Sequence, residues 1–201
     1  SGADRDLTIY RPAVIVGWYW VGHYAKGNYD PPTGEAMIIR SLTHGALKAP
    51  IGFTRVWDDG GSGASNDYSC WRPIPPVGYR TLGYVMRVNG GDQNPPSGSE
   101  IDHLMCVHED LCVEGTVDAQ DIWNDGGSGA DKDCSIYAIK PVDAEKAHPA
   151  NTFYAQPYNA CGPPKGGEFR VNRTTSGGQA GVGAAMDADG DFVVVWEGSG
   201  S

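Results

Sequence analysis

The chain has 201 residues, a formal net charge of −10, 29 glycines and 14 prolines. Apolar residues make up 40% and charged residues 20%, which is enough apolar surface for a core and too little charge for a highly charged disordered chain. Because nucleic-acid binding needs a basic footprint, the acidic balance argues against nucleic acid as a partner. The long apolar run near the start covers only residues 12–22, too short for a transmembrane helix.

An internal repeat organises the chain. Residues 52–72 and 119–138 share an apolar–Trp pair, an acidic or amide turn, Gly-Gly-Ser-Gly-Ala and a following strand-like segment. Residues 1–12 form a further copy that has only the second half of this pattern. Self-similarity of this kind predicts repeated structural units. The copies start at Ser1, Ser62 and Ser128.

Alignment of the copies predicts one strand per unit with an apolar face. Side chains alternate across a strand, so the first and third aligned columns share a face, which we expect to point inward. Cys70 stands in the third column where another copy has Ile, which favours a core position for its side chain. The four columns are Leu7/Tyr68/Cys134, Thr8/Ser69/Ser135, Ile9/Cys70/Ile136 and Tyr10/Trp71/Tyr137.

Turn and strand signals continue after each of these strands. Arg-Pro followed by Gly-aromatic recurs in residues 11–25 and 72–86, which predicts a strand–turn–strand unit. Helical periodicity is nearly absent, and only residues 143–148 could make a helical turn. Further strands are expected over residues 35–42, 101–107 and 152–155, and a hairpin over 181–186 and 192–196.

The fold class predicted is therefore all-β. Three repeated β units form a prism-like domain over residues 1–162, and residues 163–201 form a strand-rich C-terminal extension. The extension carries a possible donor strand at residues 191–197.

The first unit lacks a strand that the other two have. The second and third copies each begin with a strand ending in Trp57 or Trp123, whereas the chain starts after the corresponding point of the first copy. The C-terminal segment resembles that strand in order and character, and joining Ser201 to Ser1 would place Trp196 nearly in register. The segment comprises Phe192, Val193, Val194, Val195 and Trp196, and it would pair beside Leu7, Thr8, Ile9 and Tyr10.

Two routes are open to this segment. It can fold back into its own domain, or it can enter the next molecule, because an unpaired sheet edge is a template for another chain. Repeated head to tail, the second route gives a filament.

Three motifs carry a family resemblance: residues 57–85 (WDDGGSGASNDYSCWRPIPPVGYRTLGYV), 102–111 (DHLMCVHEDL) and 122–137 (IWNDGGSGADKDCSIY). They resemble the vacuolar protein sorting-associated family, the sixty-two type, over about residues 1–162. The resemblance implies a β-prism-like arrangement of three sheets, related in appearance to modules attached to some perforin-like pore formers. It supplies no catalytic residues. Residues 171–201 separately resemble a short repeat of large bacterial surface proteins.

Several side chains are candidates for ligand binding. Asp187, Asp189 and Asp191 alternate around a glycine and could supply oxygens to Ca²⁺, although Asp-Gly is also an ordinary hairpin turn. Asp58, Asp59 and Asp125 lie in the acidic turns of the repeat, where they could bind Ca²⁺ or sugar hydroxyls, or cap the turns by accepting from local amides. Trp18 and Trp20 belong to an aromatic cluster that could stack on sugars or anchor a partner.

The cysteines leave two interpretations open. Cys106 and Cys112 have a spacing that a hairpin disulfide could bridge, as in an exported protein. Alternatively all five cysteines are buried thiols. No Cys-x-x-Cys pair supports a zinc site.

No sequence motif supports catalysis, because neither His-Glu-x-x-His nor Gly-x-Ser-x-Gly occurs. We therefore expect a non-enzymatic module at the cell surface or outside the cell, with no certain cofactor and Ca²⁺ as the possible one. The expected partners are copies of itself, joined into a filament by strand complementation. The alternative is a lectin-like module that targets glycans or a membrane.

Overall fold

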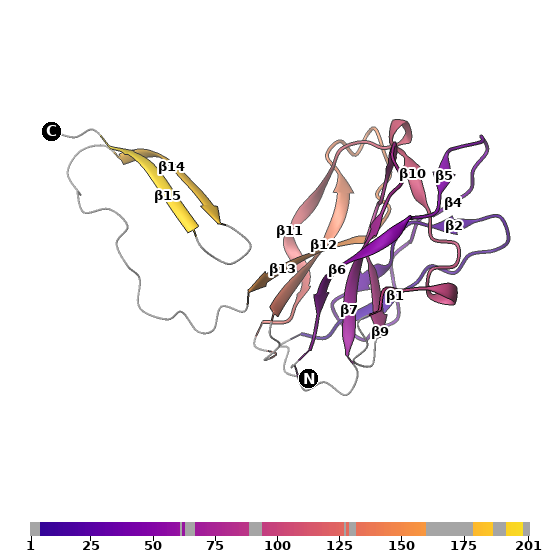
Figure 1. The fold of residues 1–201 in the computed structure, drawn as a ribbon, viewed down its shortest axis with the longest axis horizontal. Coiled ribbons are helices and arrows are strands. Elements are labelled where there is room, and N and C mark those ends of the chain that lie inside the picture. The colour runs from indigo at the N-terminus through magenta and orange to yellow at the C-terminus, as the bar shows by residue number, and fades with distance from the viewer. Residues whose placement is uncertain are drawn as a thin grey trace. The chain divides into compact units, whose positions relative to one another are not determined.

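The structure is a computed structural model that describes residues 5–60, 62, 67–88, 94–126, 128, 132–159, 179–186 and 192–198, with backbone alone from residue 158 on. The described elements are strands (Figure 1) and two short 3₁₀ helices, so the predicted all-β class is confirmed. In chain order the elements are β1 (Thr8–Tyr10), β2 (Tyr19–Trp20), β3 (Tyr24–Lys26), β4 (Ile38–Ile39), β5 (Leu47–Lys48), β6 (Gly52–Asp58), β7 (Tyr68–Ile74), β8 (Tyr79–Arg80), β9 (Val85–Val88), η1 (Gly98–Glu100), β10 (Cys106–His108), η2 (Glu109–Leu111), β11 (Gly115–Asn124), β12 (Lys132–Pro141), β13 (Phe153–Asn159), β14 (Gln179–Met186) and β15 (Phe192–Gly198).

The chain divides into two compact units, Ser1–Pro157 and Tyr158–Ser201. The compact part formed by Tyr158–Ser201 contains the hairpin of β14 and β15, which pair antiparallel with Met186 opposite Phe192. The predicted C-terminal hairpin is thereby confirmed.

Three sheets of the compact part Ser1–Pro157 reproduce the sequence repeat. Two of them have three strands each, in the orders β6-β7-β9 and β11-β12-β13, and the third pairs β1 with β3. Trp57 faces Cys70 across β6 and β7, and Trp123 faces Ile136 at the same place across β11 and β12. The strands β1, β7 and β12 are therefore equivalent, and each pairs with a strand that follows it in the sequence, β3, β9 and β13 respectively. On the other side, β7 has β6 and β12 has β11, whereas within the described residues β1 pairs with β3 alone.

The repeated units converge around a pseudo-threefold axis. The His23 N–H donates to the Tyr84 carbonyl at 3.0 Å, and the Tyr84 N–H donates to the Phe153 carbonyl at 3.1 Å. These three residues occupy the same repeat position. A Cβ on Gly83 would lie 2.3 Å from the Cβ of Thr152, so only a residue without a side chain fits there.

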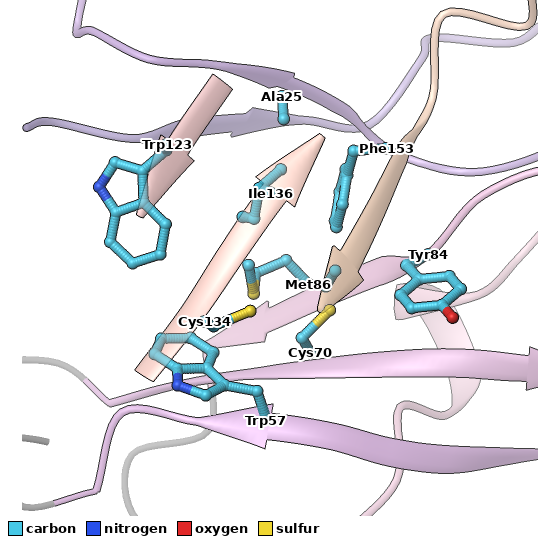
Figure 2. Packing of buried hydrophobic residues seen from close by; sticks show 10 residues of the cluster. Ala25, Trp57, Cys70, Tyr84, Met86, Trp123, Cys134, Ile136 and Phe153 are labelled. Carbon is cyan, nitrogen blue, oxygen red and sulfur yellow. The ribbon is translucent and has the colours of Figure 1, made fainter. Parts of the chain in front are cut away.

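The hydrophobic core of the compact part Ser1–Pro157 lies between the three sheets (Figure 2). Cys70, Cys134 and Ile136 are fully buried, which confirms Cys70 as a core residue and the inward direction of the third column. Tyr68, which is equivalent to Cys134, departs from the pattern and is 40% exposed. The buried cluster consists of Ala25, Trp57, Cys70, Tyr84, Met86, Trp123, Cys134, Ile136, Phe153 and Ala155.

Two further sheets, β2-β4 and β5-β10-β8, are formed by segments that flank the first and second repeats in the sequence. Trp20, Val85 and Leu104 form a second buried cluster beneath them. Residues 143–148, all of which are described, contain one hydrogen-bonded turn, in which the Lys146 N–H donates to the Asp143 carbonyl, and no longer helix forms there. Within the described parts of the chain, no helix has the length and apolar character needed to cross a membrane.

Candidate functional site

Two equivalent tryptophans tie each sheet to the next unit. Trp57 Nε1 donates to the Lys132 carbonyl at 2.7 Å, and Trp123 Nε1 donates to the Arg5 carbonyl at 2.7 Å. Lys132 and Arg5 occupy the same repeat position: Lys132 is the first residue of β12, and Arg5 lies just before β1. The two indole rings meet edge to face with centroids 6.0 Å apart (Figure 2). Trp57 thus connects the second repeat to the third, and Trp123 connects the third repeat to the first.

A pocket of about 470 Å³ lies beside β1. Its lining includes residues of β1, β7, β9 and β11 and of the turns that precede β7 and β12. The lining residues are Arg5, Asp6, Leu7, Thr8, Ile9, Tyr29, Asp59, Ser62, Tyr68, Met86, Val88, Trp123, Asp125 and Ser128.

Two apolar side chains that line this pocket, Ile9 and Tyr68, are more exposed than the residues at the same positions of the other repeats. Ile9 is half-buried, whereas Cys70 and Ile136 at the same position are fully buried. Tyr68 is 40% exposed, whereas the equivalent Cys134 is fully buried, and Val88 of the pocket lining is 56% exposed. The symmetry of the core is therefore broken at one place, beside the strand with a single described neighbour.

Buried carboxylates form the polar rim of the pocket. Asp59 Oδ1 accepts from the Tyr68 N–H at 2.6 Å, and Asp125 Oδ1 accepts from the Cys134 N–H at 2.5 Å, so each caps the start of a central strand. Burial raises the pKa of Asp59, and it raises the pKa of Asp125 to about 6. Asp125 Oδ2 is buried and has no hydrogen-bond partner.

The acidic turns are built as the capping interpretation predicts. Asp58 Oδ1 accepts from the Gly60 N–H, and its equivalent Asn124 Oδ1 accepts from the Gly126 N–H. These hydrogen bonds account for the recurrence of Asp and Asn in the repeat. No group of three or more His, Cys, Asp or Glu side chains that could hold a metal occurs among the described residues. Asp187, Asp189 and Asp191 lie outside them.

The aromatic candidates do not form a common surface. Trp20 is 1% exposed, its Nε1 donates to the Asp102 carbonyl, and its ring stacks on His23 at 5.0 Å. It belongs to the core, so its assignment to a ligand surface was wrong. Trp18 is half-buried, with the Arg40 guanidinium 5.3 Å from its ring centroid.

The possible disulfide between Cys106 and Cys112 does not form, and both cysteines are free thiols. The segment between them forms η2 instead of a hairpin turn. Cys106 is buried in β10, and the Cys112 thiol donates to the His108 carbonyl at 3.5 Å. Burial raises the pKa of Cys106 to about 11, so this side chain is a protonated core thiol.

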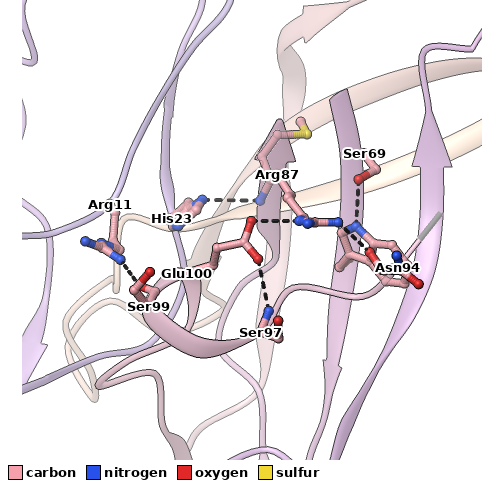
Figure 3. A network of polar contacts seen from close by, with 10 residues as sticks. Arg11, His23, Ser69, Arg87, Asn94, Ser97, Ser99 and Glu100 are labelled. Atoms are coloured by element: carbon pink, nitrogen blue, oxygen red, sulfur yellow. Dashed lines mark hydrogen bonds and ion pairs between the residues drawn. The ribbon is translucent and has the colours of Figure 1, made fainter. Parts of the chain in front are cut away.

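Sequence reasoning missed the buried His23. Its Nδ1 accepts from the Met86 N–H at 3.2 Å, and its Nε2 is buried without a partner (Figure 3). Burial, with a smaller effect from the charge of Arg11, lowers the pKa of His23 to about 4. Nearby, Arg87 Nε donates to Glu100 at 2.7 Å, and Glu100 in turn accepts from the Ser97 N–H. The only sequence signal for His23 was its place in residues 11–25, where it aligns with Tyr84 of residues 72–86.

Residues 1–161 match the family of vacuolar protein sorting-associated protein 62. The chain belongs to this family. The family resemblance seen in the repeat motifs is confirmed, and the three repeated sheets agree with a β-prism-like fold.

A solved relative supports the same arrangement. The chain is 40% identical to GNIP1Aa from Chromobacterium piscinae, whose crystal structure superimposes with a TM-score of 0.67. The similarity covers 77% of this chain and 29% of GNIP1Aa, so this family member spans less than a third of that protein. No curated protein matches the chain.

Proposed function

We propose that this protein is a non-enzymatic, extracellular structural module that assembles head to tail by β-strand complementation. The observation that carries the proposal is the unequal strand content of three equivalent sheets: β7 and β12 have neighbours on both sides, and β1 has one described neighbour. An unpaired strand edge presents N–H and C=O groups that favour pairing with another segment.

The C-terminal segment has the sequence that this edge requires. Phe192, Val195 and Trp196 repeat the spacing of Phe53, Val56 and Trp57 in β6. The segment is already a strand, β15, paired with β14 on one side. A hairpin can add to a sheet through its other edge, so β15 can join β1 without giving up β14.

The strands β1 and β15 belong to separate compact units, and the proposal is that they pair between copies. We expect β15 of one copy to lie antiparallel to β1 of the next, because β6 and β11 lie antiparallel to β7 and β12. Donor and acceptor are different surfaces of one chain, so the contact is heterologous and generates a filament unless the rotation closes a ring.

Complementary variants test the proposal. The double substitution Val193→Pro and Val194→Pro removes an N–H from each edge of β15, because successive N–H groups point to opposite sides of a strand. Val88→Arg places a charge in the acceptor pocket at a position that is already 56% exposed. Light scattering and negative-stain microscopy should show filaments for the unchanged chain and for the control Leu42→Arg, and monomers for each variant alone.

Mixing separates exchange between molecules from closure within one. The proline variant keeps a working acceptor and the arginine variant keeps a working donor, so an equimolar mixture should give dimers that grow no further. An unchanged chain that is monomeric at all concentrations, or a mixture without dimers, would refute assembly between copies.

A second function, a membrane-targeting binding module, is favoured by two exposed turns. Val16 and Val77 are both 98% exposed, and each precedes a glycine of positive φ, Gly17 at +83° and Gly78 at +80°. The Trp18 N–H donates to the Ile15 carbonyl as the Tyr79 N–H donates to the Pro76 carbonyl, so the two turns are alike. Aliphatic side chains at turn tips suit insertion into a lipid surface.

Vesicle sedimentation tests this second function. Val16→Ser and Val77→Ser together should reduce the bound fraction at least about fivefold if the tips enter the apolar layer, since each removes apolar burial. Leu42→Ser is the matched control, because Leu42 is 83% exposed and lies outside both turns. Equal binding by all three proteins would exclude the tips as the lipid contact.

A further inference from the structure

We propose that the pocket beside β1 is an indole site that receives the side chain of Trp196 and completes a ring of three tryptophans with Trp57 and Trp123. The inference rests on the proposed function in one respect, because it uses the same donor strand. It adds the side chain that anchors this strand and the chemical group that the acceptor recognises.

The direction of the two existing tryptophan contacts defines where a third would lie. Trp57, in the second unit, donates to the chain leading into the third unit. Trp123, in the third unit, donates to the chain leading into the first unit. A tryptophan that completes the first unit must therefore point toward the N-terminal end of β7, in the second unit.

The pocket lies at this place. Its walls include Leu7 and Ile9 of the first unit and Tyr68 and Met86 of the second, with Trp123 also lining it. In the two complete sheets the tryptophan faces Cys70 or Ile136, and the equivalent residue in β1 is Ile9. With β15 added in the same register, Trp196 faces Ile9 and its ring enters the pocket.

The chemistry of the pocket favours an indole over a purely apolar ring. A volume of about 470 Å³ falls within the range of pockets that hold small ligands. The edge-to-face pair of Trp57 and Trp123 can be extended by a third ring with the same geometry. The Asp59 carboxylate is part of the pocket lining and can accept a hydrogen bond from an indole N–H, which a purely apolar ring does not offer.

Peptide binding tests the indole site directly. The host is the full chain with Trp196→Ala, which has an unchanged pocket and lacks its own anchor. The probe is a synthetic peptide of residues 187–201, and calorimetry measures its affinity. We expect binding that weakens about fivefold when Trp196 of the peptide becomes Phe, the effect of one lost hydrogen bond, and about thirtyfold or more when it becomes Ala.

Control variants and outcomes distinguish this inference from the assembly proposal. Val88→Arg in the host should abolish binding, whereas Leu42→Arg should leave it unchanged. A host that does not bind the peptide, or binds the Trp, Phe and Ala peptides equally, overturns the indole site. Filaments that persist in full when Trp196 is Ala also overturn it and leave head-to-tail assembly standing. A monomeric unchanged chain whose Trp196→Ala variant binds the peptide selectively supports the site and refutes assembly.

Discussion

Two buried side chains, His23 and Asp125, respond to acid in opposite directions. The pKa of His23 is lowered from 6.5 to about 4, so below about pH 6.5 the unfolded chain binds the proton more readily and the fold loses stability. The pKa of Asp125 is raised from 3.8 to about 6, so the fold gains stability as the pH falls from about 6 to about 4. In the unchanged protein the two effects partly cancel between about pH 4 and pH 6.5.

Substitution of His23 should expose the Asp125 contribution. His23→Asn keeps an acceptor for the Met86 N–H, because Oδ1 takes the place of Nδ1, and removes the titration. Relative to the unchanged protein, this variant should become more stable as the pH falls from about 6.5 to about 4, by up to about 3 kcal/mol, since each unit of pKa corresponds to about 1.4 kcal/mol. Urea unfolding followed by tryptophan fluorescence measures the difference. A gap between the two proteins that is independent of pH would contradict the burial of a neutral His23.

Substitution of Asp125 should do the reverse. Asp125→Asn keeps Oδ1 as the acceptor for the Cys134 N–H and removes the cost of burying a charge. We expect a variant that is more stable than the unchanged protein near pH 7 and loses this advantage as the pH falls toward about 4. Asp58→Asn is the control, because Asp58 caps the equivalent turn from a more exposed position. A variant less stable than the unchanged protein at both pH values would contradict the prediction.

Gly83 is the residue whose replacement should damage the axis. Gly83→Ala brings a Cβ to 2.3 Å from the Thr152 Cβ, an overlap that should lower the free energy of unfolding by about 1–3 kcal/mol. Adding Thr152→Gly removes the overlapping side chain and should recover part of the loss. Gly52→Ala, where the nearest atom is 3.5 Å away, is the control in denaturant unfolding. Equal stability of Gly83→Ala and the control would mean that the backbones separate easily at the axis.

At the scale of elements, the sequence repeat predicted the central strands of the sheets, whereas arguments from local residue spacing failed. The aligned columns predicted β1, β7 and β12 because alternation and repetition pointed to the same strands. Spacing alone failed between Cys106 and Cys112, where η2 takes up the segment, and at Trp20, which is buried by Leu104 from a distant part of the chain. The pocket beside β1 could not be predicted, because it depends on which equivalent strands become neighbours in space.

Chemical modification tests directly whether Cys106 and Cys112 are free thiols. Alkylation in denaturant without reductant, followed by mass spectrometry, should modify both Cys106 and Cys112. Without denaturant, Cys112 should react faster than the fully buried Cys70, because Cys112 is only half-buried. A peptide pair linked through Cys106 and Cys112 would restore the disulfide interpretation.

At the scale of the whole molecule, charge opposes self-association. Each copy carries a net charge of −10, so copies repel one another over distances of about 30 Å at 0.01 M salt and about 8 Å at 0.15 M. Head-to-tail assembly should therefore be faster and more complete when the ionic strength is raised from about 0.01 M to about 0.15 M. Time-resolved light scattering measures this effect. Slower assembly at the higher salt would indicate that attraction between opposite charges, rather than apolar strand addition, holds the copies together.

The crowding at the axis restricts how this domain could have arisen and how it could be redesigned. A Cβ on Gly22 would lie 2.8 Å from both Gly83 and Thr152, so a single side chain already occupies the space that three equivalent positions share. An ancestor with three identical units could have carried glycine at every one of these positions, but not threonine. A designed domain of three identical repeats should therefore place glycine in each copy and regain the lost packing elsewhere in the core.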